Sequence, residues 1–298
     1  DEEVYTACVL GLKDYMAKNG FTGVCLGLSG GIDSALVAAM AADAVGGGNV
    51  YGISMPSMYS SQGSKDDAAD LAANIGAHYD VQPIKPMYDA FQQQLALDGV
   101  SAENLQARIR GVIVMAYSNS KGVLALATGN KSELACGYST IYGDAVGGYA
   151  PIKDVFKTKV WQLARWRNSA AAAGMGVGGL HIVGNEAGDA GVQLPGGVMI
   201  PVNSITKAPS AELRPGQKDS DSLPQYELLD RVLEAYIEHA HGRADLLADG
   251  FDDETVSTVI RLVDRAEWKR RQYPLGPKVS ALAFGRDRRL PVTGAFRE

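Results

Sequence analysis

The segment with the clearest chemical signal is residues 27–34, which read Gly27, Leu28, Ser29, Gly30, Gly31, Ile32, Asp33 and Ser34. An apolar run at 24–28 precedes it and an Ala- and Leu-rich stretch follows, so we expect a loop between a buried strand and a helix. Backbone N–H groups and the positive end of the helix dipole converge at such a loop, which suits a phosphate. No Lys occupies the position that a Walker-type loop requires, so the segment predicts a phosphate loop of another kind.

Asp33 is the unusual member of this loop, because a carboxylate repels bound phosphates unless a cation lies between them. It therefore predicts Mg²⁺ at the site. A second carboxylate, Glu133, follows the predicted strand at 123–127 and could share that cation. Two plainer interpretations stand beside these. A Gly-Gly pair before a helix is often only a tight turn, and Glu133 by itself could be a solvated residue in the first turn of a helix.

The elements that position these residues alternate along the chain. Strands are expected at 24–28, 50–55, 78–84 and 123–127, and helices at 2–19, 34–45, 65–75, 88–97 and 102–119. This alternation predicts an α/β fold, a Rossmann-like parallel sheet with helices on both faces. Ligands bind at the carboxyl ends of the strands in such sheets, and Asp33 and Glu133 each follow a strand end.

The second half of the chain has a different composition. Residues 170–200 are rich in Gly, which predicts a long mobile loop or an insertion. A short strand is expected at 198–202, a polar loop at 208–224, and helices at 155–167, 225–240 and 253–265. Asp219 and Asp221 in the polar loop are expected to be solvated, with a lid over the site as the alternative.

Composition and charge exclude several classes of protein. The 298 residues suffice for one large domain, and the net charge of −6 disfavours non-specific binding to nucleic acid. No apolar run approaches the roughly 20 residues of a membrane span, and no signal peptide is visible. The three scattered cysteines and four histidines lack metal-ligand or disulfide spacing. We therefore expect a cytoplasmic protein with reduced thiols that binds neither nucleic acid nor a membrane.

The Ser-Gly-Gly-Ile-Asp-Ser motif resembles that of the PP-loop ATP pyrophosphatases, which cleave ATP to AMP and pyrophosphate while adenylating a substrate. Within that superfamily the chain resembles the NAD synthetases. The matching stretches, in the same order, are 53–56, 104–110, 127–133, 142–144, 209–213 and 267–270. The resemblance covers nearly the whole chain apart from 170–200. It implies an adenine nucleotide alpha-hydrolase-like fold and one synthetase domain over residues 1–298.

The resemblance also implies roles for individual residues. ATP would be bound by residues 27–34 together with Met55, Thr128, Lys157 and Ser210. Lys157 and Ser210 would hold the β- and γ-phosphates, and Asp33 and Glu133 would bind Mg²⁺. The implied catalytic set is Asp33, Glu133, Lys157 and Ser210. The implied binding residues for the substrate deamido-NAD are Asn104, Arg108, Glu133, Tyr138 and Lys269. A homodimer or higher oligomer is implied too, because the family binds this substrate at a subunit interface.

Without the resemblance these residues have plainer interpretations. Lys157 would be a surface charge on its helix, Ser210 a cap after a proline, and Tyr138 a packing residue. Asn104, Arg108 and Lys269 would be solvated helix positions.

Two departures from the family pattern indicate a subfamily. Ammonia-using stand-alone members have Lys where this chain has Ile141, and Asp where it has Gly148. The chain is more similar to the synthetase half of glutamine-dependent NAD synthetases. No segment resembles the N-terminal amidase of that subfamily, so we expect the amidase domain to be absent and Asp1 to mark the boundary after it.

The implied activity is ATP-dependent amidation of deamido-NAD to NAD through an acyl-adenylate, releasing AMP and pyrophosphate. Ammonia, supplied from glutamine by the amidase or glutaminase domain, would be the nitrogen donor. Two alternatives remain at this stage. One is another PP-loop amidotransferase acting on a different acceptor, and the other is a sensor that binds ATP without turnover.

Overall fold

The fold is built on a four-stranded parallel sheet. The computed structural model describes residues 1–174 and 198–293. The strands are β1 (Val24–Gly27), β2 (Val50–Ser54), β3 (His78–Val81) and β4 (Leu124–Ala125), in the order β3-β2-β1-β4. All three pairings are parallel, which confirms the predicted α/β architecture. From β1 the chain runs outward to β2 and β3 on one side and then returns to β4 on the other side of β1. The loop after β1 therefore lies at the point where the strand order reverses, which is where ligands bind in such sheets.

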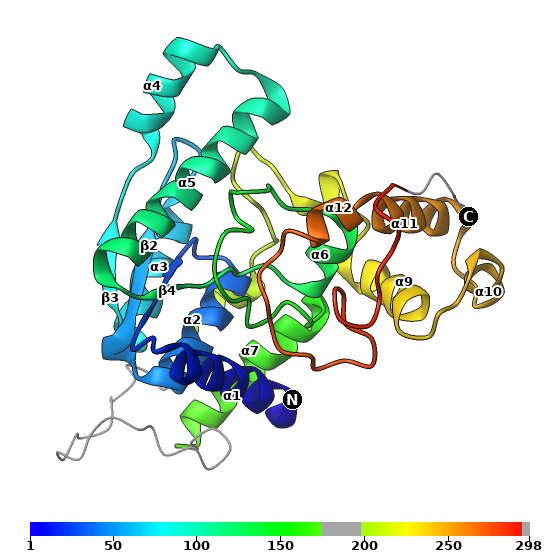
Figure 1. The fold of residues 1–298 in the computed structure, drawn as a ribbon, viewed down its shortest axis with the longest axis horizontal. Coiled ribbons are helices and arrows are strands. Elements are labelled where there is room, and N and C mark those ends of the chain that lie inside the picture. The colour runs from blue at the N-terminus through cyan, green and yellow to red at the C-terminus, as the bar shows by residue number, and fades with distance from the viewer. Residues whose placement is uncertain (175–197, 294–298) are drawn as a thin grey trace.

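Helices cover both faces of this sheet, as alternation along β1 requires. Val24 and Leu26 face a core shared with α1 (Glu2–Asn19), α2 (Ile32–Val45) and α7 (Lys157–Ala172). Cys25, between them, faces a core shared with α5 (Gly99–Lys121). Because both of its faces are buried, β1 is an apolar run without polar alternation, whereas the edge strand β3 carries His78 and Asp80 and is not buried. In Figure 1, α1 and α5 lie on opposite sides of the strands.

The remaining elements complete the sheet layer and add a second core. α3 (Gln62–Asn74) and α4 (Lys85–Leu95) follow β2 and β3, and α8 (Val202–Thr206) packs on α3. α6 (Lys131–Cys136), α9 (Tyr226–Ile237) and α11 (Asp253–Arg265) enclose the second core, beside α10 (Arg243–Ala248) and α12 (Glu267–Arg270). Figure 1 shows α9 to α12 together on one side of the molecule, away from the sheet. Trp161 of α7 packs against both cores, so α7 joins them.

One predicted strand is wrong. Residues 198–201 form no strand, and α8 begins at Val202. The side chain of Asn168 accepts hydrogen bonds from the N–H groups of Met199 and Ile200 and donates to the carbonyl of Ile200 (2.8–3.1 Å). These bonds satisfy the backbone that a neighbouring strand would otherwise pair.

The predicted loop at 170–200 also begins later than expected, since α7 continues to Ala172. Its residues 175–197 lie outside the described part of the chain. The three cysteines are free and buried. Among the described residues, no helix combines the length and apolarity needed to cross a bilayer.

Candidate active site

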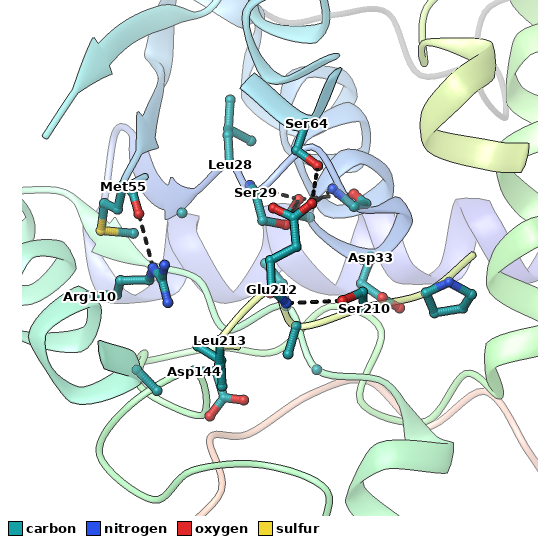
Figure 2. A pocket seen from close by; sticks show the side chains of 18 of the residues that line it. Leu28, Ser29, Asp33, Met55, Ser64, Arg110, Asp144, Ser210, Glu212 and Leu213 are labelled. Atoms are coloured by element: carbon teal, nitrogen blue, oxygen red, sulfur yellow. Dashed lines mark hydrogen bonds between the residues drawn. The ribbon is translucent and has the colours of Figure 1, made fainter. Parts of the chain in front are cut away.

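A pocket of about 300 Å³ lies at the carboxyl ends of β1 and β2. Figure 2 shows Met55 and Arg110 on one side of it and Asp33 and Ser210 on the other. The structure brings most of the predicted nucleotide and catalytic residues to its wall: Gly27, Leu28, Ser29, Gly31, Ile32, Asp33, Ser34, Met55, Thr128, Glu133, Tyr138, Lys157 and Ser210. Gly30, Asn104, Arg108 and Lys269 do not line this pocket.

The loop after β1 is a tight, internally hydrogen-bonded turn. Ser34 Oγ donates to the carbonyl of Gly31 (3.0 Å) and lies 3.1 Å from Ser29 Oγ, which accepts from the N–H of Gly31 (3.2 Å). Gly30 has φ 77°, and a Cβ built there would lie 2.2 Å from the carbonyl oxygen of Ser64. Only Gly fits this position, because α3 packs directly against the loop. The loop is therefore held in shape by the protein alone.

Three charged side chains from different helices converge beside this loop. Asp33 is in the first turn of α2, Glu133 in the first turn of α6, and Lys157 begins α7. Lys157 Nζ forms an ion pair with Asp33 Oδ2 and lies 3.6 Å from Glu133 Oε1, with its side chain only 3% exposed. Burial alone would lower the pKa of Lys157, but the two carboxylates outweigh it and raise that pKa. Lys157 is thus no surface charge.

Glu133 is held at this site by the start of α6. Burial and the nearby Asp33 carboxylate raise the pKa of Glu133 to about 8. α6 has a capping box in which Asn130 and Glu133 exchange side chain-to-backbone hydrogen bonds. Lys131, fully buried, anchors the same turn through ion pairs to Asp154 (2.9 Å) and Glu238 (2.7 Å). Glu133 is therefore a fixed, mostly buried acidic side chain and not a solvated one.

Asp219 was expected to be solvated, and that expectation is wrong. Its side chain is buried and accepts hydrogen bonds from Tyr226 (3.0 Å) and Tyr138 (3.3 Å). Burial raises the pKa of Asp219. Asp219 lines the pocket, whereas Asp221 is exposed as expected. Tyr138 consequently has a polar role in addition to packing.

The segment 207–213 closes one side of the pocket. Lys207 forms an ion pair with Asp67 of α3 (2.9 Å), and Glu212 accepts from the hydroxyls of Ser61 and Ser64 (2.9 Å each). Figure 2 shows Glu212 reaching across to Ser64. Ser210 Oγ donates to the carbonyl of Gln217 (2.6 Å) and accepts from the N–H of Glu212 (3.1 Å), and Ser210 lines the pocket.

Sequence reasoning missed Arg110. Its Nε donates to the carbonyl of Met55 (3.0 Å), and burial lowers the pKa of its guanidinium to about 10. A usable signal existed, because Ala107, Arg110, Gly111 and Val114 have helical spacing and all line the pocket.

The other predicted substrate residues gather beside the pocket, around residues 137–141. Lys269 Nζ donates to the carbonyls of Gly137 and Ser139 (2.7 Å each) and lines a neighbouring cavity of about 100 Å³. Asn104 Oδ1 accepts from the hydroxyl of Thr140 (2.8 Å). Arg108 is exposed and donates to the carbonyl of Ile141 (3.3 Å). The two cavities share Ser139, Val146 and Tyr273, so this region is continuous with the main pocket.

Comparison with known proteins agrees with this geometry. The family model described as NAD synthase matches residues 4–273. The chain belongs to the NAD synthase family. The match includes every residue that lines the main pocket and all but Pro274 of those that line the neighbouring cavity, and it confirms the resemblance inferred from the motifs.

Individual relatives in the NAD synthase family are similar over the whole chain. The glutamine-dependent NAD(+) synthetase of Acinetobacter baylyi is 47% identical over 99% of this chain and 51% of its own length. The glutamine-dependent NAD(+) synthetase of Rhodobacter capsulatus is 49% identical over 100% of this chain and 52% of its own length. The chain therefore spans about half the length of these relatives.

Solved structures of NAD synthases have the same fold. The glutamine-dependent enzyme of Acinetobacter baumannii in complex with ADP has 43% identity and a TM-score of 0.59, covering 97% of this chain and 49% of that one. The NH₃-dependent enzyme of Campylobacter jejuni has 29% identity and a TM-score of 0.66, and the match covers 88% of this chain and 93% of that one.

Proposed function

We propose that this domain amidates deamido-NAD to NAD at the expense of ATP, releasing AMP and pyrophosphate. The observation that carries the proposal is the convergence of Asp33, Glu133 and Lys157 beside the glycine loop, within a chain of the NAD synthase family. A relative at 43% identity was solved with ADP, which supports an adenine nucleotide in the same pocket.

Residues 27–34 would cradle the phosphates of ATP. The N-terminus of α2 directs its dipole at this loop, and Ser29 and Ser34 provide hydroxyl donors. Met55 and Thr128, both on the pocket wall, would contact the nucleoside. Lys157 and Ser210 would hold the β- and γ-phosphates that leave as pyrophosphate.

The donor set beside the loop fits Mg²⁺. Asp33 and Glu133 each turn one carboxylate oxygen toward the Lys157 ammonium, so a cationic position between them already exists. Carboxylate oxygens are the protein ligands that Mg²⁺ prefers, usually one or two of them together with substrate phosphates. Within residues 1–174 and 198–293 no group of three or more His, Cys, Asp or Glu could hold a metal. Bound there, Mg²⁺ would neutralise charge on the phosphates.

The reaction has two steps in which the protein aligns reactants. The nicotinate carboxylate of deamido-NAD attacks the α-phosphorus, and the bond to the bridging oxygen breaks to release pyrophosphate. Ammonia then attacks the acyl carbonyl, AMP leaves with the acyl C–O electron pair, and a proton is lost from nitrogen. Lys157 stabilises charge on the departing pyrophosphate. Deamido-NAD would be held by Asn104, Arg108, Glu133, Tyr138 and Lys269.

The relatives support a proposal for the nitrogen source, and the resemblance to the family implies the assembly. The matching curated enzymes are called glutamine-dependent and are about twice as long as this chain. We therefore propose that ammonia is the direct nitrogen donor, that a glutaminase domain of the intact cytoplasmic enzyme supplies it, and that the synthetase domain forms a homodimer or higher oligomer.

The test is NAD formation by this chain with ATP, Mg²⁺ and deamido-NAD, comparing ammonium with glutamine. We expect NAD from ammonium and none from glutamine. Pyrophosphate release only with another acceptor, such as xanthosine monophosphate or aspartate, would replace the proposed substrate. ATP binding with no turnover in the presence of any acceptor would refute an enzymatic role.

A further inference from the structure

Asn130 makes hydrogen bonds to both carboxylate residues of the proposed metal site. It is fully buried and is the residue that immediately precedes α6. Its Nδ2 donates to Asp33 Oδ1 (2.8 Å), and its Oδ1 accepts from the N–H of Glu133 (3.0 Å). Its own N–H donates to Glu133 Oε2 (3.2 Å). One buried residue thus contacts two acidic residues that stand 100 positions apart in the sequence.

These contacts divide the four carboxylate oxygens into two pairs. Asp33 Oδ1 and Glu133 Oε2 accept from Asn130, while Asp33 Oδ2 and Glu133 Oε1 face Lys157 Nζ. Terminal torsions of Asp and Glu side chains are broad, so an untethered carboxylate would turn freely. Asn130 removes that freedom at both residues and leaves one oxygen of each directed at the position of the cation.

The partners of Asn130 also fix the orientation of its amide. If the amide were turned by 180°, its oxygen would face the Asp33 carboxylate and its NH₂ would face the N–H of Glu133. Both contacts would then pair like with like, acceptor with acceptor and donor with donor. The orientation in the structure is the one that satisfies both neighbours.

The donor side of this amide goes beyond what a helix cap requires. An N-cap needs only an acceptor for the N–H of the third helical residue, which Ser, Thr or Asp supplies as well as Asn. The bond from Asn130 Nδ2 to Asp33 contributes nothing to the cap of α6, because Asp33 belongs to α2. It connects the two helices whose first turns carry the acidic residues.

We propose that Asn130 is a positioning residue, which orients Asp33 and Glu133 so that one oxygen of each faces a shared divalent cation. The inference rests on the metal site proposed above and adds a residue to it. Removal of an outer partner of metal-binding carboxylates lowers metal affinity roughly 10- to 100-fold.

The test uses Mn²⁺ as the probe, titrated by electron paramagnetic resonance into this chain with saturating α,β-methylene-ATP. Asn130→Ser keeps a cap acceptor but lacks the amide that reaches Asp33. We expect its Mn²⁺ affinity to fall roughly 10- to 100-fold while its melting temperature stays near that of the parent. Asn130→Ala loses both functions, so its melting temperature should fall as well.

Asp252→Ala is the matched control, because Asp252 caps α11 through the N–H of Thr255 (2.9 Å) and lines neither cavity. It should lose stability and keep its Mn²⁺ affinity. Parental affinity in Asn130→Ser would overturn the proposal and leave Asn130 as a cap only. Absence of Mn²⁺ binding in the parent would instead refute the metal site itself, and the positioning role with it, whatever the outcome of the NAD assay.

Discussion

Replacing Lys157 with Met should create a protein that depends on Mg²⁺ for stability. Lys157 is the buried cation between Asp33 and Glu133. At 3.6 Å and an effective dielectric constant of about 20, its attraction to the ionised form of Glu133 alone would be about 5 kcal/mol. Breaking a buried ion pair by removing one partner costs roughly 3–5 kcal/mol. We therefore expect Lys157→Met to lose about that much unfolding free energy in metal-free buffer.

A divalent cation should restore much of this loss, because it binds the two carboxylates that the substitution leaves unpaired. With Mg²⁺ at 100 times its Kd, binding to the native state adds about 2.7 kcal/mol. A Kd of about 0.1 mM would thus give that gain at about 10 mM Mg²⁺. The parent without nucleotide should respond much less, since Lys157 already fills the cationic position. The assay is urea denaturation of both proteins with and without Mg²⁺.

Arg167→Met is the control, because Arg167 pairs with Asp43 (2.7 Å) in a buried position that offers a single carboxylate. It should also be destabilised, yet Mg²⁺ should not restore it. The reasoning would be refuted if Mg²⁺ stabilised the parent, Lys157→Met and Arg167→Met equally. It would also be refuted if Lys157→Met were as stable as the parent without metal.

Three further predictions concern Asp33, Gly30 and Tyr117. Asp33→Asn should abolish pyrophosphate release while the circular dichroism spectrum stays unchanged; a normal rate would remove Asp33 from the metal site. Gly30→Ala should raise the KM for ATP and lower the melting temperature, because the new Cβ meets the Ser64 carbonyl at a φ of 77°; parental values of both would contradict the packing argument. The hydrogen bond to Asp80 raises the pKa of Tyr117 from 10.0 to about 12, so its contribution to stability is present below pH 10 and lost as pH rises from about 10 to 12. Tyr117→Phe should therefore cost about 1 kcal/mol of unfolding free energy at pH 7 and nothing near pH 12, and a pH-independent cost would contradict this assignment.

The sequence predicted the elements whose signal is local. The glycine loop and the four strands follow from patterns within a few residues, and the structure places each of them close to its predicted range. α10 was missed, and α6 and α12 were expected only as helical positions at Glu133 and Lys269 without bounds, since helices of four to six residues have too few turns to show a periodic apolar face. The same limit explains the false strand at 198–202, where a neighbouring side chain decides the backbone conformation.

The site itself was predictable only in part, because its chemistry depends on pairs that are distant in sequence. By type alone Lys157 could be a surface charge, and its burial follows from α7 lying between two cores. Asp219 is buried because two tyrosines, one of them 81 residues away, donate to it. The resemblance to NAD synthetases supplied Lys157, since motifs carry information about tertiary contacts that periodicity lacks.

The role proposed for Asn130 could be predicted neither from local sequence patterns nor from the resemblance to the family. An Asn before a helix is fully explained as a cap, and the family motif around it directs attention to Glu133. Its second role is visible only when the first turns of α2 and α6 are placed side by side, because the deciding bond joins residues 97 positions apart. A cap that also binds a carboxylate of a second helix links helix stability to the geometry of the metal site. Substitutions that separate the two effects are therefore the direct way to establish what Asn130 does.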